Sequence, residues 1–152
     1  MKAILCLFFT TLSFCVAWGA DAAKRESENA IKEATFRYQF LHLTPEQQRV
    51  NAKFYVLSYG AKTKGPDEEF LKRFATNSPP IKEGALVLGT SDGWFAKGTK
   101  DQGLSFVIAK IQWVSDSEVA VVGACEETAS RSSWHTYHLK KETANWTVSK
   151  VQ

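Results

Sequence analysis

Residues 103–127, GLSFVIAKIQWVSDSEVAVVGACEE, decide the fold that the rest of the chain must complete. The stretch holds two apolar runs rich in β-branched residues, separated by Ser115, Asp116 and Ser117. Such runs predict two strands joined by a tight connection, and therefore an antiparallel pair. Both runs carry apolar residues at successive positions, so both faces of the pair are apolar. A sheet of this kind is covered on both sides or curls around its own interior.

Strict alternation divides the side chains of each run between the two faces. In the first run one face carries Val107, Ala109, Ile111 and Trp113, and the other carries Leu104, Phe106, Ile108, Lys110 and Gln112. In the second run Val119, Val121, Gly123 and Cys125 oppose Ala120, Val122 and Ala124.

Other segments with strand composition flank this pair, at residues 53–59, 81–89, 132–141 and 146–151. Turn sequences separate them at Asp92-Gly93, Ala129-Ser130 and Thr143-Ala144-Asn145. Consecutive strands with short links predict an antiparallel meander. The segment 94–102 is polar and contains glycine, which favours a loop. For residues 53–59 the alternative is a helix that continues from Pro45 to Ser58, but the aromatic density favours a strand.

Helical spacing precedes the strands. From Glu28 apolar residues recur at steps of three and four, and the helix is expected to end near His42 because Pro45 disfavours helical backbone at Thr44. Thr44-Pro45-Glu46-Gln47 predicts the start of a second, short helix. A third is expected after Asp67, burying Phe70, Leu71 and Phe74.

The composition suits one compact domain: 152 residues, 44% of them hydrophobic and 23% charged. The formal net charge is only +3 and no basic stripe occurs, which argues against a nucleic-acid partner.

The first residues have the pattern of a secretory signal peptide. Lys2 precedes a charge-free apolar run at residues 3–16, and small residues allow cleavage before Ala20 or before Ala23. We favour the second site, which gives a signal peptide at residues 1–22, a single domain at residues 23–152 and a secreted or periplasmic location.

Two alternatives remain open at this terminus. An uncleaved anchor would need about 20 apolar residues, and this run is at the short limit, so no stable membrane insertion is expected. Lipidation at Cys15 would require a small preceding residue, and Phe14 is bulky. Cleavage also removes Cys6, so Cys125 alone remains and no internal disulfide is expected.

The order helix, strand, helix and meandering strands resembles the nuclear transport factor 2-like (cystatin-like α+β cone) superfamily. Its small exported members often end as this chain does, with Ile111-Gln112-Trp113, the strand from Trp134 to Lys140, and Asn145-Trp146-Thr147-Val148. The resemblance covers residues 28–151. It implies an α+β fold, with a curved antiparallel sheet of about five to six strands and N-terminal helices packed on its concave face.

The resemblance leaves the function open, because the superfamily contains isomerases, dehydratases, cyclases, ligand binders and interaction domains. Its isomerases use a carboxylate base in an apolar pocket. The only strand carboxylates here, Glu118, Glu126 and Glu127, lie near strand ends. We therefore expect a non-catalytic ligand-binding or protein-interaction domain. The alternatives are a small isomerase, dehydratase or cyclase acting on an apolar metabolite in the cone, and an immunity or inhibitor protein.

Large side chains on the strands and helices are the candidates for a pocket lining. They are Tyr38, Phe74, Trp113, Cys125 and Tyr137. The partner is expected to be a small apolar ligand or a protein, and analogy with similar folds suggests a homodimer through the open sheet face.

Trp94 and Phe95 stand outside the obvious core. They either form a surface that contacts a partner, or fold back as a lid over the interior.

No metal or cofactor site is expected. His135 and His138 are three residues apart on a predicted strand and so point to opposite faces. Cys125 has apolar neighbours, which favours a buried hydrophobic role over that of a nucleophile.

Overall fold

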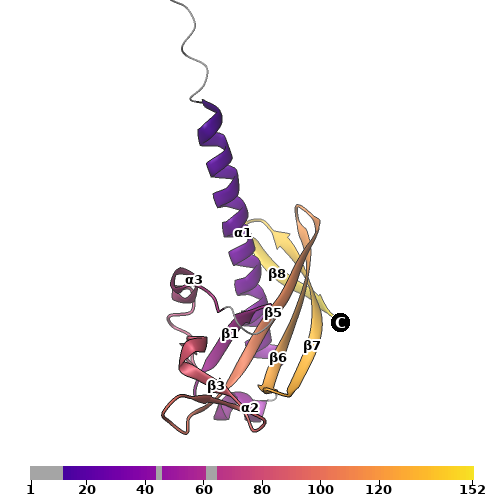
Figure 1. Cartoon of the computed structure of the whole chain (residues 1–152). Coiled ribbons are helices and arrows are strands. Elements are labelled where there is room, and N and C mark those ends of the chain that lie inside the picture. The colour runs from indigo at the N-terminus through magenta and orange to yellow at the C-terminus, as the bar shows by residue number, and fades with distance from the viewer. Residues whose placement is uncertain (1–11, 44–45, 61–64) are drawn as a thin grey trace, which may run out of the picture.

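The computed structural model describes residues 12–43, 46–60 and 65–152, with side chains from residue 21 onward (Figure 1). One long helix, α1 (Leu12–His42), contacts a curved sheet through the strands β5, β6 and β8. The fold is α+β, as predicted. The remaining elements are α2 (Glu46–Asn51), β1 (Tyr55–Tyr59), α3 (Glu68–Lys72), β2 (Ile81–Lys82), the short 3₁₀ helix η1 (Gly84–Leu86), β3 (Val87–Gly89), β4 (Trp94–Ala96), β5 (Gln102–Ser115), β6 (Glu118–Thr128), β7 (Arg131–Glu142) and β8 (Asn145–Val151).

The sheet has eight strands, and its main path runs β2-β1-β5-β6-β7-β8. The antiparallel meander from β5 to β8 confirms the prediction, and β1 is a strand rather than a continued helix. The prediction that the whole sheet is antiparallel was wrong, because β1 lies parallel to both β5 and β2. A long connection that contains α3 joins β1 to β2, and such a crossover can bring the next strand back in the same direction.

Two local predictions between β2 and β5 were also wrong. The strand expected at residues 81–89 is interrupted by η1, so only its two ends are strands. The segment expected to be a loop contains β4, which pairs with β3 and with the start of β5. The turn at Asp92-Gly93 is confirmed, because the Thr90 amide donates to the Gly93 carbonyl.

A β-bulge in β5 corrects the predicted strand faces. Ile108 pairs with Gly123 and Lys110 pairs with Val122, so Ala109 is an extra residue on β5. The extra residue reverses the alternation beyond it. As a result, Ile111 packs against the same core as Ile108 instead of sharing a face with Val107.

Each face of the sheet has its own apolar cluster. The larger cluster lies between α1, α3 and the sheet and is rich in aromatic rings; Phe36 and Phe40 of α1 contact Phe74, and Phe40 also contacts Phe106. The smaller cluster lies on the other face, where β3 and β4 cover Phe54 and Val56. The sheet is therefore covered on both faces in this region, as its two apolar faces predicted.

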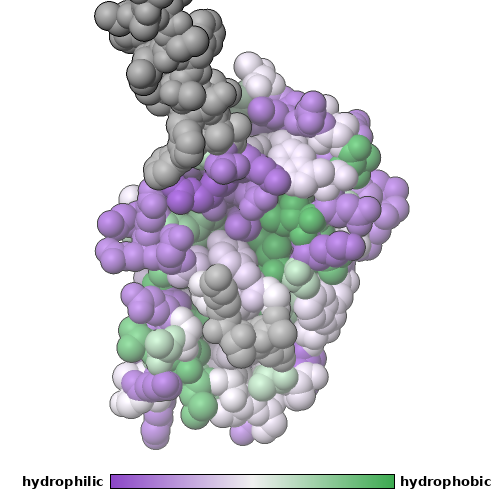
Figure 2. All heavy atoms as spheres, turned by 45° about the horizontal axis from the view of Figure 1, so that its top comes forward, coloured by the Kyte–Doolittle hydropathy of each residue, from purple (hydrophilic) through white to green (hydrophobic). Residues whose placement is uncertain are grey.

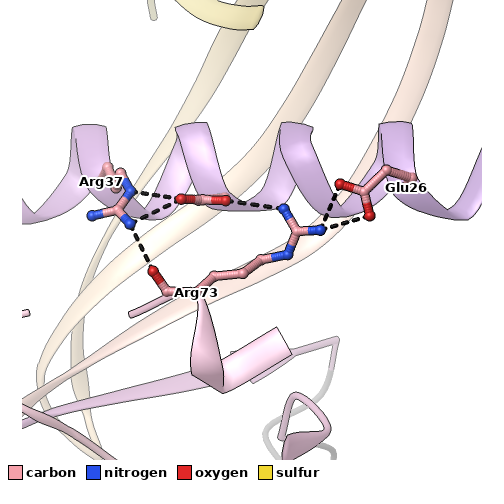
Figure 3. Close-up of polar contacts among 4 residues, drawn as sticks. Glu26, Arg37 and Arg73 are labelled. Atoms are coloured by element: carbon pink, nitrogen blue, oxygen red, sulfur yellow. Dashed lines mark hydrogen bonds and ion pairs between the residues drawn. The ribbon is translucent and has the colours of Figure 1, made fainter. Parts of the chain in front are cut away.

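A network of charged side chains connects α1 with the end of α3 (Figure 3). The Arg73 side chain runs along α1 and contacts the carboxylates of both Glu26 and Glu33. Glu33 also contacts Arg37, which donates in turn to the Arg73 carbonyl. The start of α3 is fixed by Asp67, whose carboxylate accepts from the Phe70 amide as an N-cap.

Hydrophilic residues gather around the end of the body from which α1 extends, on the face shown in Figure 2. No helix in the described ranges combines the length and the apolarity needed to cross a membrane. The first half of the predicted signal peptide, residues 1–11, lies outside the described residues, and residues 12–22 belong to α1, so its cleavage stays a prediction.

Candidate functional site

A cavity of about 660 Å³ lies on the sheet face that carries the smaller cluster. Its floor is formed by side chains of β1, β5 and β6, and η1, β3 and β4 supply its opposite wall. Residues of α3 and of the segment before it form part of the rim. The volume falls in the range of sites that bind small organic molecules.

The floor holds a hydrogen-bonded pair of buried polar side chains. Ser105 on β5 and Glu126 on β6 are directly opposite in the strand register, and each is only 1% exposed. The Ser105 hydroxyl donates to Glu126 Oε2 at 3.0 Å. A carboxyl group buried this deeply in a sheet is costly unless partners satisfy it, and its position facing a cavity makes this a candidate site.

Two further polar atoms in the cavity wall have no hydrogen-bond partner in the described structure. They are Ser58 Oγ on β1, whose residue is 7% exposed, and Trp94 Nε1 on β4, whose residue is half-buried. Buried polar groups in folded proteins almost always have a partner. A ligand with both donor and acceptor atoms would supply the missing contacts.

Alternation along β1 places Ser58 in this wall. Tyr55 and Leu57 belong to the core on the α1 side, so Val56 and Ser58 face the cavity. Trp94 reaches the site because Gly89, opposite it on β3, has no side chain. A Cβ at Gly89 would lie 2.7 Å from Trp94 Cζ3, so a side chain at this position would clash with the indole ring.

Four of the lining residues that the structure describes carry a charged side chain. Glu68 and Glu83 lie exposed at the rim and Glu126 lies on the floor, and Lys82 is the cation among these described residues. Lys82 Nζ lies 5.2 Å from the centre of the Phe54 ring, a cation–π contact. Glu68 forms an exposed ion pair with Lys72, with Nζ and Oε1 3.4 Å apart.

The structure places four of the five predicted pocket residues in packed surroundings on the α1 side. Phe74, Cys125 and Tyr137 are 2%, 3% and 0% exposed, and Tyr38 packs against them from α1. None of them lines the 660 Å³ cavity. Trp113 is 38% exposed and contacts Trp146 edge-on, at 5.6 Å between ring centres.

Tyr38 and Tyr137 do meet, as expected, with their ring centres 6.0 Å apart. Gln39 Nε2 donates to the Tyr137 hydroxyl at 3.1 Å. Burial raises the pKa of Tyr137 to about 12, and the hydrogen bond from Gln39 opposes part of that rise. This tyrosine is a neutral component of the core at physiological pH.

The two aromatics at the hairpin have different positions. Trp94 packs against the smaller cluster and lines the cavity, which fits the interpretation as a lid. Phe95 is half-buried and pairs with Leu88 across the β3–β4 hairpin.

Sequence reasoning missed Ser58 and Ser105 and placed Glu126 only at a strand end. The structure extends β6 to Thr128, so Glu126 lies within the paired strand. The available signal was the occurrence of single polar residues inside otherwise apolar runs, at Ser58 in KFYVLSY and at Ser105 in GLSFVI.

The two histidines of β7 lie apart from this site. His138 Nε2 is 3.1 Å from Gln152 Oε1, and the His135 ring lies 6.3 Å from that of Tyr137. Across the residues that the structure describes, no three metal-binding side chains come together.

None of the family models, curated proteins or solved structures compared with this chain matches it, so the site is interpreted from its own geometry.

Proposed function

We propose that the protein is an exported domain that binds a small organic ligand in the cavity between β1, β5, β6 and the β3–β4 hairpin. The observation that carries the proposal is the buried Ser58 hydroxyl, which has no hydrogen-bond partner among the described residues and lines the same cavity as Ser105 and Glu126. A ligand that bonded to this hydroxyl would recover the free energy that its burial costs.

The shape and chemistry of the wall support binding of a molecule with a polar end and an apolar body. Val56, Leu71 and Val87 supply apolar surface, while the polar groups cluster on the floor and at Trp94. This combination of apolar walls with a few fixed polar groups is typical of ligand sites.

The packing on the other face argues against an enzyme that works in a cone between the helices and the sheet. That space is filled by the aromatic cluster around Phe36, Phe40 and Phe106. The isomerase or dehydratase alternative is supported by one observation, the buried carboxyl group of Glu126, and would have to use the cavity described here. Chemical conversion of a bound ligand on incubation, lost in Glu126→Gln, would favour this alternative over simple binding.

Native mass spectrometry of the purified full chain tests the proposal. We expect a co-purified small molecule on the wild-type protein. The variant Ser58→Leu should fold but lose it, because the larger side chain fills the space beside Glu126. Ser133→Leu, on the exposed part of β7, is the matched control and should keep the molecule. A ligand retained in full by folded Ser58→Leu would contradict the proposal.

A further inference from the structure

We infer that a groove between α1, α2 and residues 77–79 binds a small organic carboxylate, whose charged end pairs with Arg49 and whose hydrocarbon body covers exposed apolar side chains. This groove is a second site, because it shares no lining residue with the cavity between β1, β5 and β6. Three observations carry the inference: the size of the groove, the balance of its charges and the apolar surface that it exposes.

The groove has the size of a site for a small organic molecule. Its volume is about 360 Å³, and residues of α1, α2, the start of β1 and the segment 77–79 line it. The lining includes the buried rings of Phe40 and Tyr55 as well as the exposed side chains of Leu41 and Val50. The groove therefore reaches from the core on the α1 side to the surface.

The charged side chains of the lining are positive. They are Arg37 and Arg49, and no lining residue carries a carboxylate. All 16 Asp and Glu residues of the chain belong to the part that the structure describes, so no undescribed residue supplies a negative charge here. Thr44 and Pro45, which separate α1 from α2, are uncharged.

The charge of Arg37 is already matched. Arg37 and Arg73 share the carboxylates of Glu26 and Glu33, so this network holds two positive and two negative groups (Figure 3). A ligand would gain little from the charge of Arg37, because Glu33 contacts that guanidinium group directly.

Arg49 carries the charge that is left over. Its guanidinium group donates to the Leu41 carbonyl at 2.6 Å, in the last turn of α1, and the described residues give it no ion pair. This hydrogen bond holds the planar group in place and leaves N–H donors that match the two oxygens of a carboxylate. Burial raises the pKa of Tyr55 and the charge of Arg49 opposes that rise, so the charge acts within the groove. One unmatched positive charge fits a ligand with a single negative charge.

The apolar surface of the groove requires more than an inorganic anion. Leu41 on α1 and Val50 on α2 are among the exposed large hydrophobic residues of the described structure, and both line this groove with Arg49. A hydrocarbon body would remove their side chains from water, which a small inorganic anion would not do.

Four probes separate the contributions of charge and hydrocarbon: hexanoate, hexanamide, hexylamine and acetate. Nuclear magnetic resonance titration of the isotope-labelled full chain at neutral pH and low salt should give the tightest binding for hexanoate, by at least about tenfold over hexanamide. Acetate and hexylamine should bind more weakly than hexanoate by a similar factor. The shifted resonances should belong to the end of α1, to α2 and to residues 77–79, and added salt should weaken the binding of hexanoate.

Variants assign the preference to Arg49. Arg49→Gln should remove the preference for hexanoate over hexanamide, and Arg49→Lys should restore part of it, because an ammonium group keeps the charge without the fork geometry. Arg131→Gln is the matched control, because Arg131 is exposed, forms its ion pair with Glu127 and does not line the groove. Ser58→Leu should keep hexanoate binding, because Ser58 lies in the other cavity.

A second pair of variants covers a failure of Arg49→Gln to fold. Val50→Glu places a carboxylate beside Arg49 at an exposed position and should weaken hexanoate binding by at least about tenfold. Val114→Glu makes the same change at an exposed position of β5, outside the groove, and should leave the binding unchanged.

Several outcomes would overturn the inference. They are equal binding of hexanoate and hexanamide, equal binding of hexanoate and acetate, a preference that persists in folded Arg49→Gln, and loss of hexanoate binding in Ser58→Leu. Groove resonances that shift on dilution of the protein alone would identify a second copy of the chain as the occupant, and would also overturn it. Each of these results leaves the proposed ligand of the other cavity to its own test, the co-purified molecule in native mass spectrometry.

Discussion

Arg73 Nη2 lies 2.6 Å from each carboxylate oxygen of Glu26, a residue 47 positions earlier in the chain. Because Arg73 also contacts Glu33, one guanidinium group joins two turns of α1 to the end of α3 (Figure 3). The hydrogen bonds that Arg73 donates to Glu26 raise the pKa of Arg73, which stays charged throughout the accessible pH range. Among the side chains of α1 that the structure describes, which begin at residue 21, Glu26 is the first with an ion pair to the rest of the fold.

Arg73→Ala should lower the free energy of unfolding by about 1 to 2 kcal/mol, because it removes a partly buried network rather than one exposed pair. Arg73→Lys should recover only part of this loss, since an ammonium group cannot bind two carboxylates in the same fork geometry. Denaturant unfolding measures both. The control is Lys72→Ala, whose ion pair with Glu68 is exposed, and its effect should stay below about 0.5 kcal/mol. Equal losses for Arg73→Ala and Lys72→Ala would contradict this account.

Removal of the chain before the Glu26 contact should have little effect on stability. Residues 21–25 are exposed, whereas Glu26 contacts Arg73 and the Ser27 hydroxyl accepts from Trp146 Nε1 at 3.3 Å. A chain that starts at Ala23, the favoured processed form, should match the full chain in free energy of unfolding within about 0.5 kcal/mol. A chain that starts at Glu28 loses both contacts and should be less stable by about 1 to 2 kcal/mol. N-terminal sequencing of protein exported by the native host tests the cleavage itself, and an intact Met1 would contradict it.

Alkaline pH should destabilise the protein partly through Tyr137. Its pKa is raised by burial to about 12, while an unfolded tyrosine titrates near pH 10. Above about pH 10 the unfolded chain loses this proton and the folded protein keeps it. The stabilisation is therefore complete below about pH 10 and is lost as the pH rises through about 12. Tyr137→Phe should be less stable at neutral pH, because it loses the hydrogen bond from Gln39, but its stability should fall less steeply above pH 10. Identical slopes in urea titrations of the two proteins would refute this.

The sequence predicted those parts of the fold that local patterns determine. The four long strands from β5 to β8 follow from apolar runs and polar turns, and α3 follows from Asp67 and the acidic residues after it. The parallel position of β1 could not be predicted, because it depends on pairing with β5, about 50 residues away, rather than on any local signal. The bulge at Ala109 is equally hidden, since Ala109 and its neighbours have ordinary strand composition.

The candidate site was less predictable than the fold. Glu126 is a candidate site residue for two reasons that only the structure shows. The strand register puts Ser105 opposite it, and the β3–β4 hairpin covers this face of the sheet. That hairpin depends on Gly89 lying against Trp94, a contact between side chain and backbone that no periodic pattern reveals. A search limited to large aromatic residues on the strands led instead to the core on the α1 side.

The two tryptophans in edge-on contact should differ in their effect on stability. Trp146 is 6% exposed within the core, so Trp146→Ala should cost about 3 to 5 kcal/mol. Trp113 is 38% exposed, so Trp113→Ala should cost only about 1 to 2 kcal/mol, through lost contact with Trp146 and lost partial burial. Thermal and denaturant unfolding of both variants measures the difference. A loss of 3 kcal/mol or more in Trp113→Ala would show that this ring is far better packed than its exposure indicates.

Cys125 should behave as a buried part of the core rather than as a reactive thiol. It is 3% exposed on β6, in the same apolar cluster as Phe106, the residue opposite it on β5. In a chain that starts at Ala23 it is the only cysteine, so a thiol reagent reports on this site alone. Labelling of the native protein should therefore be slow and limited by opening of the structure, and fast in denaturant.

Cys125→Ser should lower the free energy of unfolding by about 1 to 3 kcal/mol, because a hydroxyl buried in this cluster costs more than a thiol. Cys125→Ala is the control that removes sulfur without adding a polar group, and its loss should be smaller. Native labelling at the rate of an exposed thiol, or a Cys125→Ser variant as stable as the wild type, would contradict this role.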